Sequence, residues 1–227
     1  MIRVRHKTLF DTFPGKLTIV FGNLKSGKST SIMVDAIANA ANRKKVLFIS
    51  YDKSKKELDE FFSNYSLSLK DYLYPFNNFV IDDDAGTKFI QLLLKITNSD
   101  ADIVYIDYIA AVKFTNGKCD VGFTIKELER CARITGKAIV ITDLLNRDPF
   151  TEEDLYNPPK WYKKVVDIDK GHYLYAISGK RVSSTIYQYI DNEFQIIKKN
   201  FRASDYYDKA EMQKRIYENI YWRHNFE

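Results

Sequence analysis

The sequence predicts an α/β fold in which a mostly parallel sheet is flanked by helices, followed by an antiparallel hairpin and a terminal helix. Short β-branched apolar runs alternate along the chain with segments of helical periodicity. Such alternation is typical of right-handed βαβ units. The first apolar run ends in a glycine-containing loop that opens a helix. From residue 172 onward, apolar and polar residues alternate as they do in antiparallel strands.

Length and composition limit the possible classes of protein. The 227 residues suffice for one large domain, and 45% hydrophobic and 29% charged residues are typical of a globular chain. The net charge of +5 permits nucleic-acid binding without requiring it. Because the longest apolar stretch is too short for a membrane span and the N-terminus lacks the apolar core of a signal peptide, we expect a cytoplasmic protein with no membrane partner.

The elements follow in order along the chain. Strands are expected at residues 17–21, 46–50, 79–81, 101–112, 138–142, 172–178, 185–190 and 194–201. Helices are expected from about residue 28, from residue 54, and over residues 89–96, 122–134 and 207–222. Ser54 and Glu57 form the capping box that begins the second helix. Residues 146–164 form a long polar loop with three prolines, and a loop of that length in a compact domain is usually functional.

The loop after the first strand matches the pattern G-x-x-x-x-G-K-[ST]. Its nucleotide-binding residues are predicted to be Gly22, Asn23, Leu24, Lys25, Ser26, Gly27, Lys28, Ser29 and Thr30. In this P-loop, backbone N–H groups and the helix N-terminus face the phosphates, and Lys28 adds a cation. Ser29 would coordinate Mg²⁺, so ATP and Mg²⁺ are the expected cofactors. The alternative is a glycine turn that only joins strand to helix.

A P-loop needs a second acid to orient Mg²⁺, and Asp107 lies at the end of the apolar run "IVYI", within residues 101–112. The ends of parallel strands deliver their side chains to the ligand edge of the sheet. Asp107 is therefore the expected Walker B aspartate and a second metal residue. The alternative is a strand-end acid held in a salt bridge.

The order of segments resembles the RecA-like motor core of the DnaB-type replicative helicases over about residues 13–202. The resemblance covers "GKLTIVFGNLKSGKSTSIMVDAIANAA", "KVLFISYDKSKKEL", "FVIDDDAG", "ADIVYIDYIAAV", "GKAIVITDLLNRD" and the hairpin after "GKR". It implies a RecA-like P-loop ATPase domain at residues 1–205, with a C-terminal helical extension at 206–227. Only about twelve residues precede the motor core, whereas these helicases carry an N-terminal domain and a linker helix.

The resemblance also implies roles for single residues. The P-loop lysine and the Walker B aspartate of the family correspond to Lys28 and Asp107. Asp52 occupies the position of the family's catalytic glutamate. Leu144 replaces a glutamine that senses the γ-phosphate. Lys180 and Arg181 resemble the lysine and arginine that reach a neighbouring subunit's nucleotide, which requires a homo-oligomer; the alternative is a solvated basic pair.

Two loops are expected to face single-stranded DNA. The candidate residues are Lys113, Lys118, Lys160, Trp161, Lys163 and Lys164, which combine positive charge with an aromatic ring for stacking on bases. The alternative is that the aromatic residues anchor a loop or form a subunit contact. The terminal helix could contact a neighbouring subunit or cover its own sheet.

Three functions remain open from the sequence. The first is a DnaB-like ATPase that hydrolyses Mg-ATP in connection with single-stranded DNA during replication or recombination. The second is a weakly or non-hydrolysing accessory module that assembles with ATP, because an aspartate side chain is one methylene shorter than the glutamate of the family. The third, a nucleotide kinase, ranks last because no arginine-rich lid segment is present in the sequence.

Overall fold

A computed structural model describes residues 7–22, 26–66, 77–82, 88–112, 120–144, 173–180, 183–190 and 193–201. The strands are β1 (Leu17–Gly22), β2 (Val46–Ser50), β3 (Phe79–Asp82), β4 (Ile103–Asp107), β5 (Ala138–Leu144), β6 (Tyr173–Lys180), β7 (Ser183–Ile190) and β8 (Glu193–Phe201). The helices are α1 (Lys28–Ala41), α2 (Lys55–Ser66), α3 (Phe89–Asn98), the short 3₁₀ helix η1 (Ile109–Ala111) and α4 (Val121–Thr135). The expected helix at 207–222 and the expected domain boundary at residue 205 lie outside these residues.

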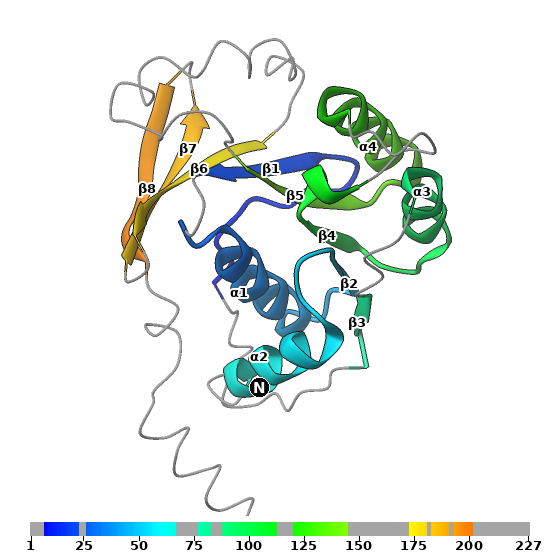
Figure 1. Cartoon of the computed structure of the whole chain (residues 1–227), viewed down its shortest axis with the longest axis horizontal. Coiled ribbons are helices and arrows are strands. Elements are labelled where there is room, and N and C mark those ends of the chain that lie inside the picture. The colour runs from blue at the N-terminus through cyan, green and yellow to red at the C-terminus, as the bar shows by residue number, and fades with distance from the viewer. Residues whose placement is uncertain are drawn as a thin grey trace, which may run out of the picture.

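The described strands form one eight-stranded sheet in the order β3-β2-β4-β5-β1-β6-β7-β8. Every pairing from β3 to β6 is parallel, and β6, β7 and β8 pair antiparallel. The α/β fold with a mostly parallel sheet and an antiparallel end is therefore confirmed. Because the strands from β3 to β6 are parallel, the carboxyl ends of β1, β2, β4 and β5 meet at one edge (Figure 1).

Two apolar cores lie on opposite faces of the sheet, and successive strand residues alternate between them. Val104 and Ile106 of β4 pack with α3 and α4, whereas Ile103 and Tyr105 pack with α1 and α2. In Figure 1 the two helix pairs accordingly lie on different sides of the strands. Strands β1, β2 and β4 are buried on both faces, which holds their ends in fixed positions.

The run 101–112 is not one continuous strand, which corrects the sequence prediction. Strand β4 ends at Asp107, and the chain then forms η1. The N–H groups of Ala111 and Val112 donate to the carbonyls of Tyr108 and Ile109 at 3.2 and 3.0 Å, which closes two tight turns. Ile109 and Val112 are fully buried. The run is apolar because the turns are part of the core.

Helix α4 begins one residue earlier and ends one residue later than predicted. Asp120 is its N-cap, and its carboxylate accepts a 2.9 Å hydrogen bond from the N–H of Phe123. At the other end Gly136 has a φ of 69°, a left-handed conformation that terminates helices and favours glycine. No helix in the described part of the chain is both long and apolar enough to cross a membrane.

The described N-terminal residues are tied to α1 by a buried polar cluster. The backbone N–H groups of Leu9 and Phe10 donate to Asp35 Oδ1. Tyr105 donates its hydroxyl hydrogen to Asp35 Oδ2 at 2.7 Å, and Asn39 Nδ2 donates to the Tyr105 oxygen at 2.9 Å. Burial raises the pKa of Asp35 to about 6, although these hydrogen bonds oppose the rise.

Candidate nucleotide site

The predicted phosphate loop lies between β1 and α1 at the edge where the strand carboxyl ends meet. Gly27 has a φ of 98°, which a residue with a side chain rarely adopts, and it caps α1 without a side-chain hydrogen bond. The first turn of α1 contains no acidic residue. No acidic side chain of this turn therefore neutralises the partial positive charge at the N-terminus of α1, and this charge favours binding of an anion. Asn23, Leu24 and Lys25 lie outside the described residues.

Lys28, the first residue of α1, is 7% exposed. Its Nζ donates a 2.8 Å hydrogen bond to the carbonyl oxygen of Gly22, at the end of β1. Burial lowers the pKa of Lys28 to about 8, and the nearby carboxylates of Asp107 and Asp143 partly offset this shift. A cation that is only partly compensated in this way is well suited to bind a phosphate group.

Asp107 connects α1 to two strands. Its Oδ1 accepts a 3.0 Å hydrogen bond from Ser29 Oγ and a 2.7 Å hydrogen bond from Thr142 Oγ1. Its Oδ2 is buried and has no hydrogen-bond partner among the described residues. Burial raises the pKa of Asp107, and the bonds from Thr142 and Ser29 oppose the rise. A buried carboxylate oxygen without a partner is costly unless a ligand completes its contacts.

These residues fit the Mg²⁺ site that the sequence predicts. Mg²⁺ is bound in nucleotide sites through one or two protein oxygens, waters and the phosphates of the substrate. Ser29 Oγ and Asp107 Oδ2 provide such oxygens. No cluster of three or more histidine, cysteine or acidic side chains that could hold a metal occurs in the described ranges, so a metal here depends on further ligands from nucleotide and water.

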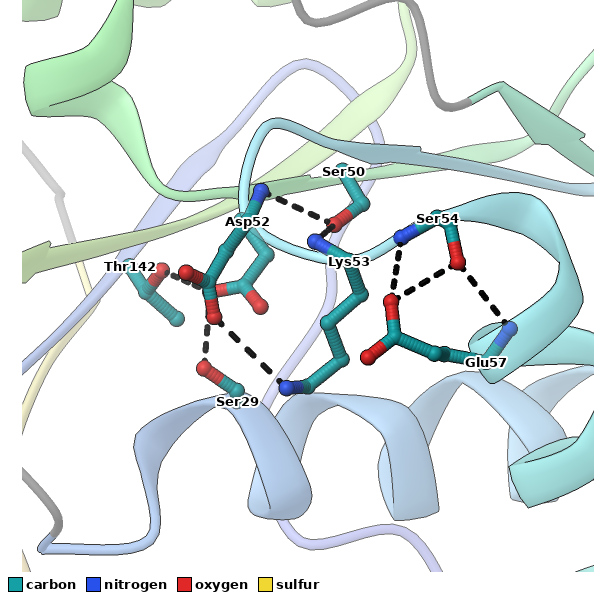
Figure 2. A network of polar contacts seen from close by, with 8 residues as sticks. Ser29, Ser50, Asp52, Lys53, Ser54, Glu57 and Thr142 are labelled. Carbon is teal, nitrogen blue, oxygen red and sulfur yellow. Dashed lines mark hydrogen bonds and ion pairs between the residues drawn. The ribbon is translucent and has the colours of Figure 1, made fainter.

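The loop after β2 brings Asp52 to the same place. The N–H of Tyr51 donates a 2.6 Å hydrogen bond to the carbonyl oxygen of Asp107. Figure 2 shows the side chains of Asp52 and Lys53 extending from this loop toward Ser29. Asp52 raises the pKa of Asp107 and Lys53 lowers it, so both charges act on the carboxyl group of Asp107. The structure thus brings together Lys28, Ser29, Asp52 and Asp107.

Thr142 and Asp143 are site residues that the sequence analysis did not assign. The sequence pattern identifies Thr142 only as the last residue of an apolar strand, yet its hydroxyl group holds the Asp107 carboxylate. Asp143 is 4% exposed and acts electrostatically on Lys28. Both follow the apolar run 138–141. A polar pair at the end of a buried parallel strand is the signal that could have identified them.

The other predicted site residues are only partly described. Lys180 is the last residue of β6 and pairs with Ser183 of β7. It lies three positions beyond Ile177, which pairs with Gly22 at the end of β1. Its backbone therefore extends past the end of β1 at the phosphate-loop edge. Residues that lie outside the described part of the chain are Arg181, Lys113, Lys118, Lys160, Trp161, Lys163 and Lys164.

Comparisons with known proteins identify the fold. No protein-family model matches the chain, and the search of curated proteins finds no match. Among solved structures, a DnaB-like replicative helicase matches with a TM-score of 0.61 and 13% identity, covering 82% of this chain and 54% of the helicase. A second solved structure, of an ATPase domain, matches with a TM-score of 0.58 and 14% identity over 81% of this chain and 80% of that domain.

The RadB recombinase also matches, with a TM-score of 0.53 and 14% identity over 84% of this chain and 86% of the recombinase. This chain spans about half the length of the DnaB-like helicase. All three alignments cover more than four fifths of this chain, so the likeness includes the sheet and the helices on both of its faces. The chain has the RecA-like fold that these proteins share.

Proposed function

We propose that this protein binds ATP with Mg²⁺ and hydrolyses it. One observation carries the proposal: Ser29 and Thr142 hold one oxygen of the buried Asp107 carboxylate, and its second oxygen has no hydrogen-bond partner among the described residues. This arrangement lies at the N-terminus of α1, where the N-cap Gly27 makes no side-chain hydrogen bond, and beside the ammonium of Lys28, whose pKa burial lowers. A phosphate group with its metal would satisfy all of these groups together.

Each residue has a specific part in the proposed reaction. The N–H groups at the start of α1 and the Lys28 ammonium bind the phosphates, and Ser29 and Asp107 hold Mg²⁺. The metal ion supplies neutralisation of charge on the phosphate oxygens. Asp52 orients the attacking water, although its side chain is one methylene shorter than a glutamate. Lys180 and Arg181 act on the nucleotide of a neighbouring copy, so full activity requires a homo-oligomer, either a ring or a filament.

We further propose that hydrolysis is connected with single-stranded DNA in replication or recombination. Support comes from the structural neighbours, which include a replicative helicase and a recombinase. The expected DNA contacts, Lys113, Lys118 and the segment 160–164 with Trp161, add charge and one stacking surface. A replication protein that recruits the chain is a further expected partner.

A second function is a nucleotide-dependent accessory module with weak or no hydrolysis. The observation that favours it is the state of Asp52, whose Oδ2 lies 3.6 Å from the Lys53 ammonium and whose side chain is 53% exposed. A carboxylate that is short, solvated and paired with a cation is a poor group for holding an attacking water. Binding of ATP would then drive assembly, with turnover slow or absent.

Release of phosphate from Mg-ATP, with and without single-stranded DNA, distinguishes the two functions. Lys28→Met is the control that removes the phosphate-binding charge, and Asp52→Glu restores the longer carboxylate. Turnover above the Lys28→Met background, stimulated by DNA, supports the ATPase. If the wild-type protein binds Mg-ATP but releases no phosphate, and Asp52→Glu then does, the accessory module is the better description. Turnover that DNA does not change contradicts the connection with DNA.

A further inference from the structure

We propose that Lys53 is a γ-phosphate-binding residue that makes the site prefer nucleoside triphosphates over diphosphates. This inference rests on the proposed nucleotide binding and goes beyond it, because it assigns the discrimination to one side chain of the same subunit. In the structure the Lys53 ammonium pairs with Asp52. A γ-phosphate would take over the ammonium and release the Asp52 carboxylate.

Three hydrogen bonds from backbone N–H groups fix the position of Lys53. Its N–H donates a 2.9 Å hydrogen bond to Ser50 Oγ, which also accepts a 3.3 Å hydrogen bond from the N–H of Asp52. The N–H of Tyr51 donates to the carbonyl of Asp107 at 2.6 Å. The loop is thereby attached to both β2 and β4 at the edge that carries Ser29 and Asp107. Its two charged side chains cannot lie far from a phosphate bound there.

The ion pair between Lys53 and Asp52 is easily exchanged. The distance of 3.6 Å between Lys53 Nζ and Asp52 Oδ2 is too long for a hydrogen bond. The two side chains are 32% and 53% exposed, and a solvated pair of this kind contributes little to stability. A phosphate carries more negative charge than one carboxylate and accepts shorter, charge-assisted hydrogen bonds. The ammonium therefore gains by moving from Asp52 to a γ-phosphate.

The charges of the described site support the same assignment. Asp107 and Asp143 act electrostatically on Lys28, and Asp52 and Lys53 act on Asp107. Lys28 is held at the base of the phosphate loop by Gly22. Lys53 comes from a different element and lies beside Asp52, the residue assigned to the attacking water. A cation beside the attacking water faces the terminal phosphate rather than the α- or β-phosphate.

The exchange couples recognition to hydrolysis. While Lys53 is paired with Asp52, the carboxylate is engaged by a positive charge and holds water less effectively. Transfer of the ammonium to a γ-phosphate frees the carboxylate when the substrate is present. A diphosphate lacks the group that Lys53 binds, so the pair with Asp52 persists.

The test is a titration of the wild-type protein and its variants with Mg-ADP and with a Mg-bound, non-hydrolysable ATP analogue. Lys53→Met removes the charge at similar side-chain length, and Lys53→Arg restores it. Lys56→Met, an exposed lysine of α2, is the matched control for the change in net charge. In Lys53→Met the ratio of analogue affinity to ADP affinity is expected to fall about tenfold, with little change for ADP. Lys53→Arg and Lys56→Met should keep the wild-type ratio.

A second variant tests the exchange itself. In Asp52→Asn, Lys53 no longer has a competing carboxylate, so affinity for the triphosphate analogue should rise while affinity for ADP stays near the wild-type value. In the double variant with Lys53→Met this gain should disappear. The inference is overturned if Lys53→Met keeps the wild-type ratio, or if Asp52→Asn gains equal affinity for both nucleotides.

The same titration separates failure of this inference from failure of nucleotide binding. If the wild-type protein binds neither nucleotide, or if Lys28→Met binds both as tightly as wild type, the proposed function fails and the inference fails with it. If wild type binds both, Lys28→Met binds neither, and Lys53→Met is indistinguishable from Lys56→Met, only the inference fails. Thermal unfolding of each variant excludes misfolding as the cause of lost binding.

Discussion

Lys28 and Asp107 are buried charged residues whose pKa values shift in the direction that disfavours the charge. Burial lowers the pKa of Lys28 to about 8 and raises that of Asp107. The carboxylates near Lys28 and the hydroxyl groups bonded to Asp107 recover only part of this cost. Residues that destabilise the free protein in this way are characteristic of binding sites, since a ligand with the complementary charge recovers the loss.

The lowered pKa of Lys28 predicts how its substitution affects stability. The unfolded chain, with a lysine pKa of 10.5, binds more protons than the folded protein between about pH 8 and pH 10.5, so the contribution of Lys28 to stability rises with pH across that window. At pH 7 the buried charge of Lys28 lowers the free energy of unfolding by up to about 3 kcal/mol. Lys28→Met should therefore be at least as stable as wild type at pH 7, and lose this advantage by pH 10.5.

Denaturant unfolding of wild type and Lys28→Met at pH 7, 9 and 10.5, without nucleotide, measures this difference. A difference in unfolding free energy that is constant across these pH values would show that the charge carries no such cost.

At the scale of single elements, the site depends on where each strand ends and each helix begins. Strand β4 ends at Asp107 and β5 at Leu144, and α1 begins at Lys28. These boundaries place Ser29 and Thr142 within hydrogen-bonding distance of Asp107. Helix α4 connects β4 to β5, so its ends determine how the two strands that carry Asp107 and Thr142 are joined.

The contribution of the α4 N-cap to stability can be measured by substitution. Asp120→Ala removes the acceptor for the N–H of Phe123 and should lower the free energy of unfolding by about 1 kcal/mol. Asp120→Asn keeps a capping oxygen and should remain within a few tenths of a kcal/mol of wild type. Chemical denaturation of the three proteins gives the comparison. Equal loss in both variants would indicate that the charge of Asp120, and not its capping hydrogen bond, supports the helix.

At the scale of the whole molecule, the described N-terminal residues join distant parts of the sheet. The carbonyl of Asp11 accepts a 2.8 Å hydrogen bond from Thr18 of β1, and its carboxylate accepts a 2.9 Å hydrogen bond from Gln188 of β7. Two residues earlier, the chain donates to Asp35 of α1. The helix that begins at the phosphate loop is thus connected through this segment to the antiparallel end of the sheet.

Asp35 should make the stability of the whole fold depend on pH. The pKa of Asp35 is about 6 in the folded protein and 3.8 in the unfolded chain, so the folded state binds more protons between these pH values. The contribution of Asp35 to the free energy of unfolding therefore falls as pH rises from about 4 to 6. The loss amounts to up to about 3 kcal/mol. The free energy of unfolding of Asp35→Asn should lack this pH-dependent contribution. The difference in unfolding free energy between the two proteins across pH 4 to 6 measures it, and a flat difference would contradict the account.

Local sequence patterns predicted much of the fold because they report periodicity and loop chemistry directly. The P-loop pattern identified Lys28 and Ser29, and the acid in an apolar run identified Asp107. The turns after β4 were missed because an apolar run does not distinguish a buried strand from the buried turns around Ile109. The polar cluster of Asp35 and Tyr105 was missed because it joins residues 70 positions apart. Such a pairing has no signal in either local segment.

The most direct test of the central claim is a calorimetric titration of the nucleotide-free protein with ATP, with and without Mg²⁺, beside Lys28→Met. The account predicts saturable one-site binding by wild type that Mg²⁺ strengthens and that Lys28→Met abolishes. Asp107→Asn should retain weak binding but lose the effect of Mg²⁺, since it alters the carboxylate assigned to the metal. Binding that is equal in wild type and Lys28→Met, or absent from both, would contradict the assignment of this loop as a nucleotide site.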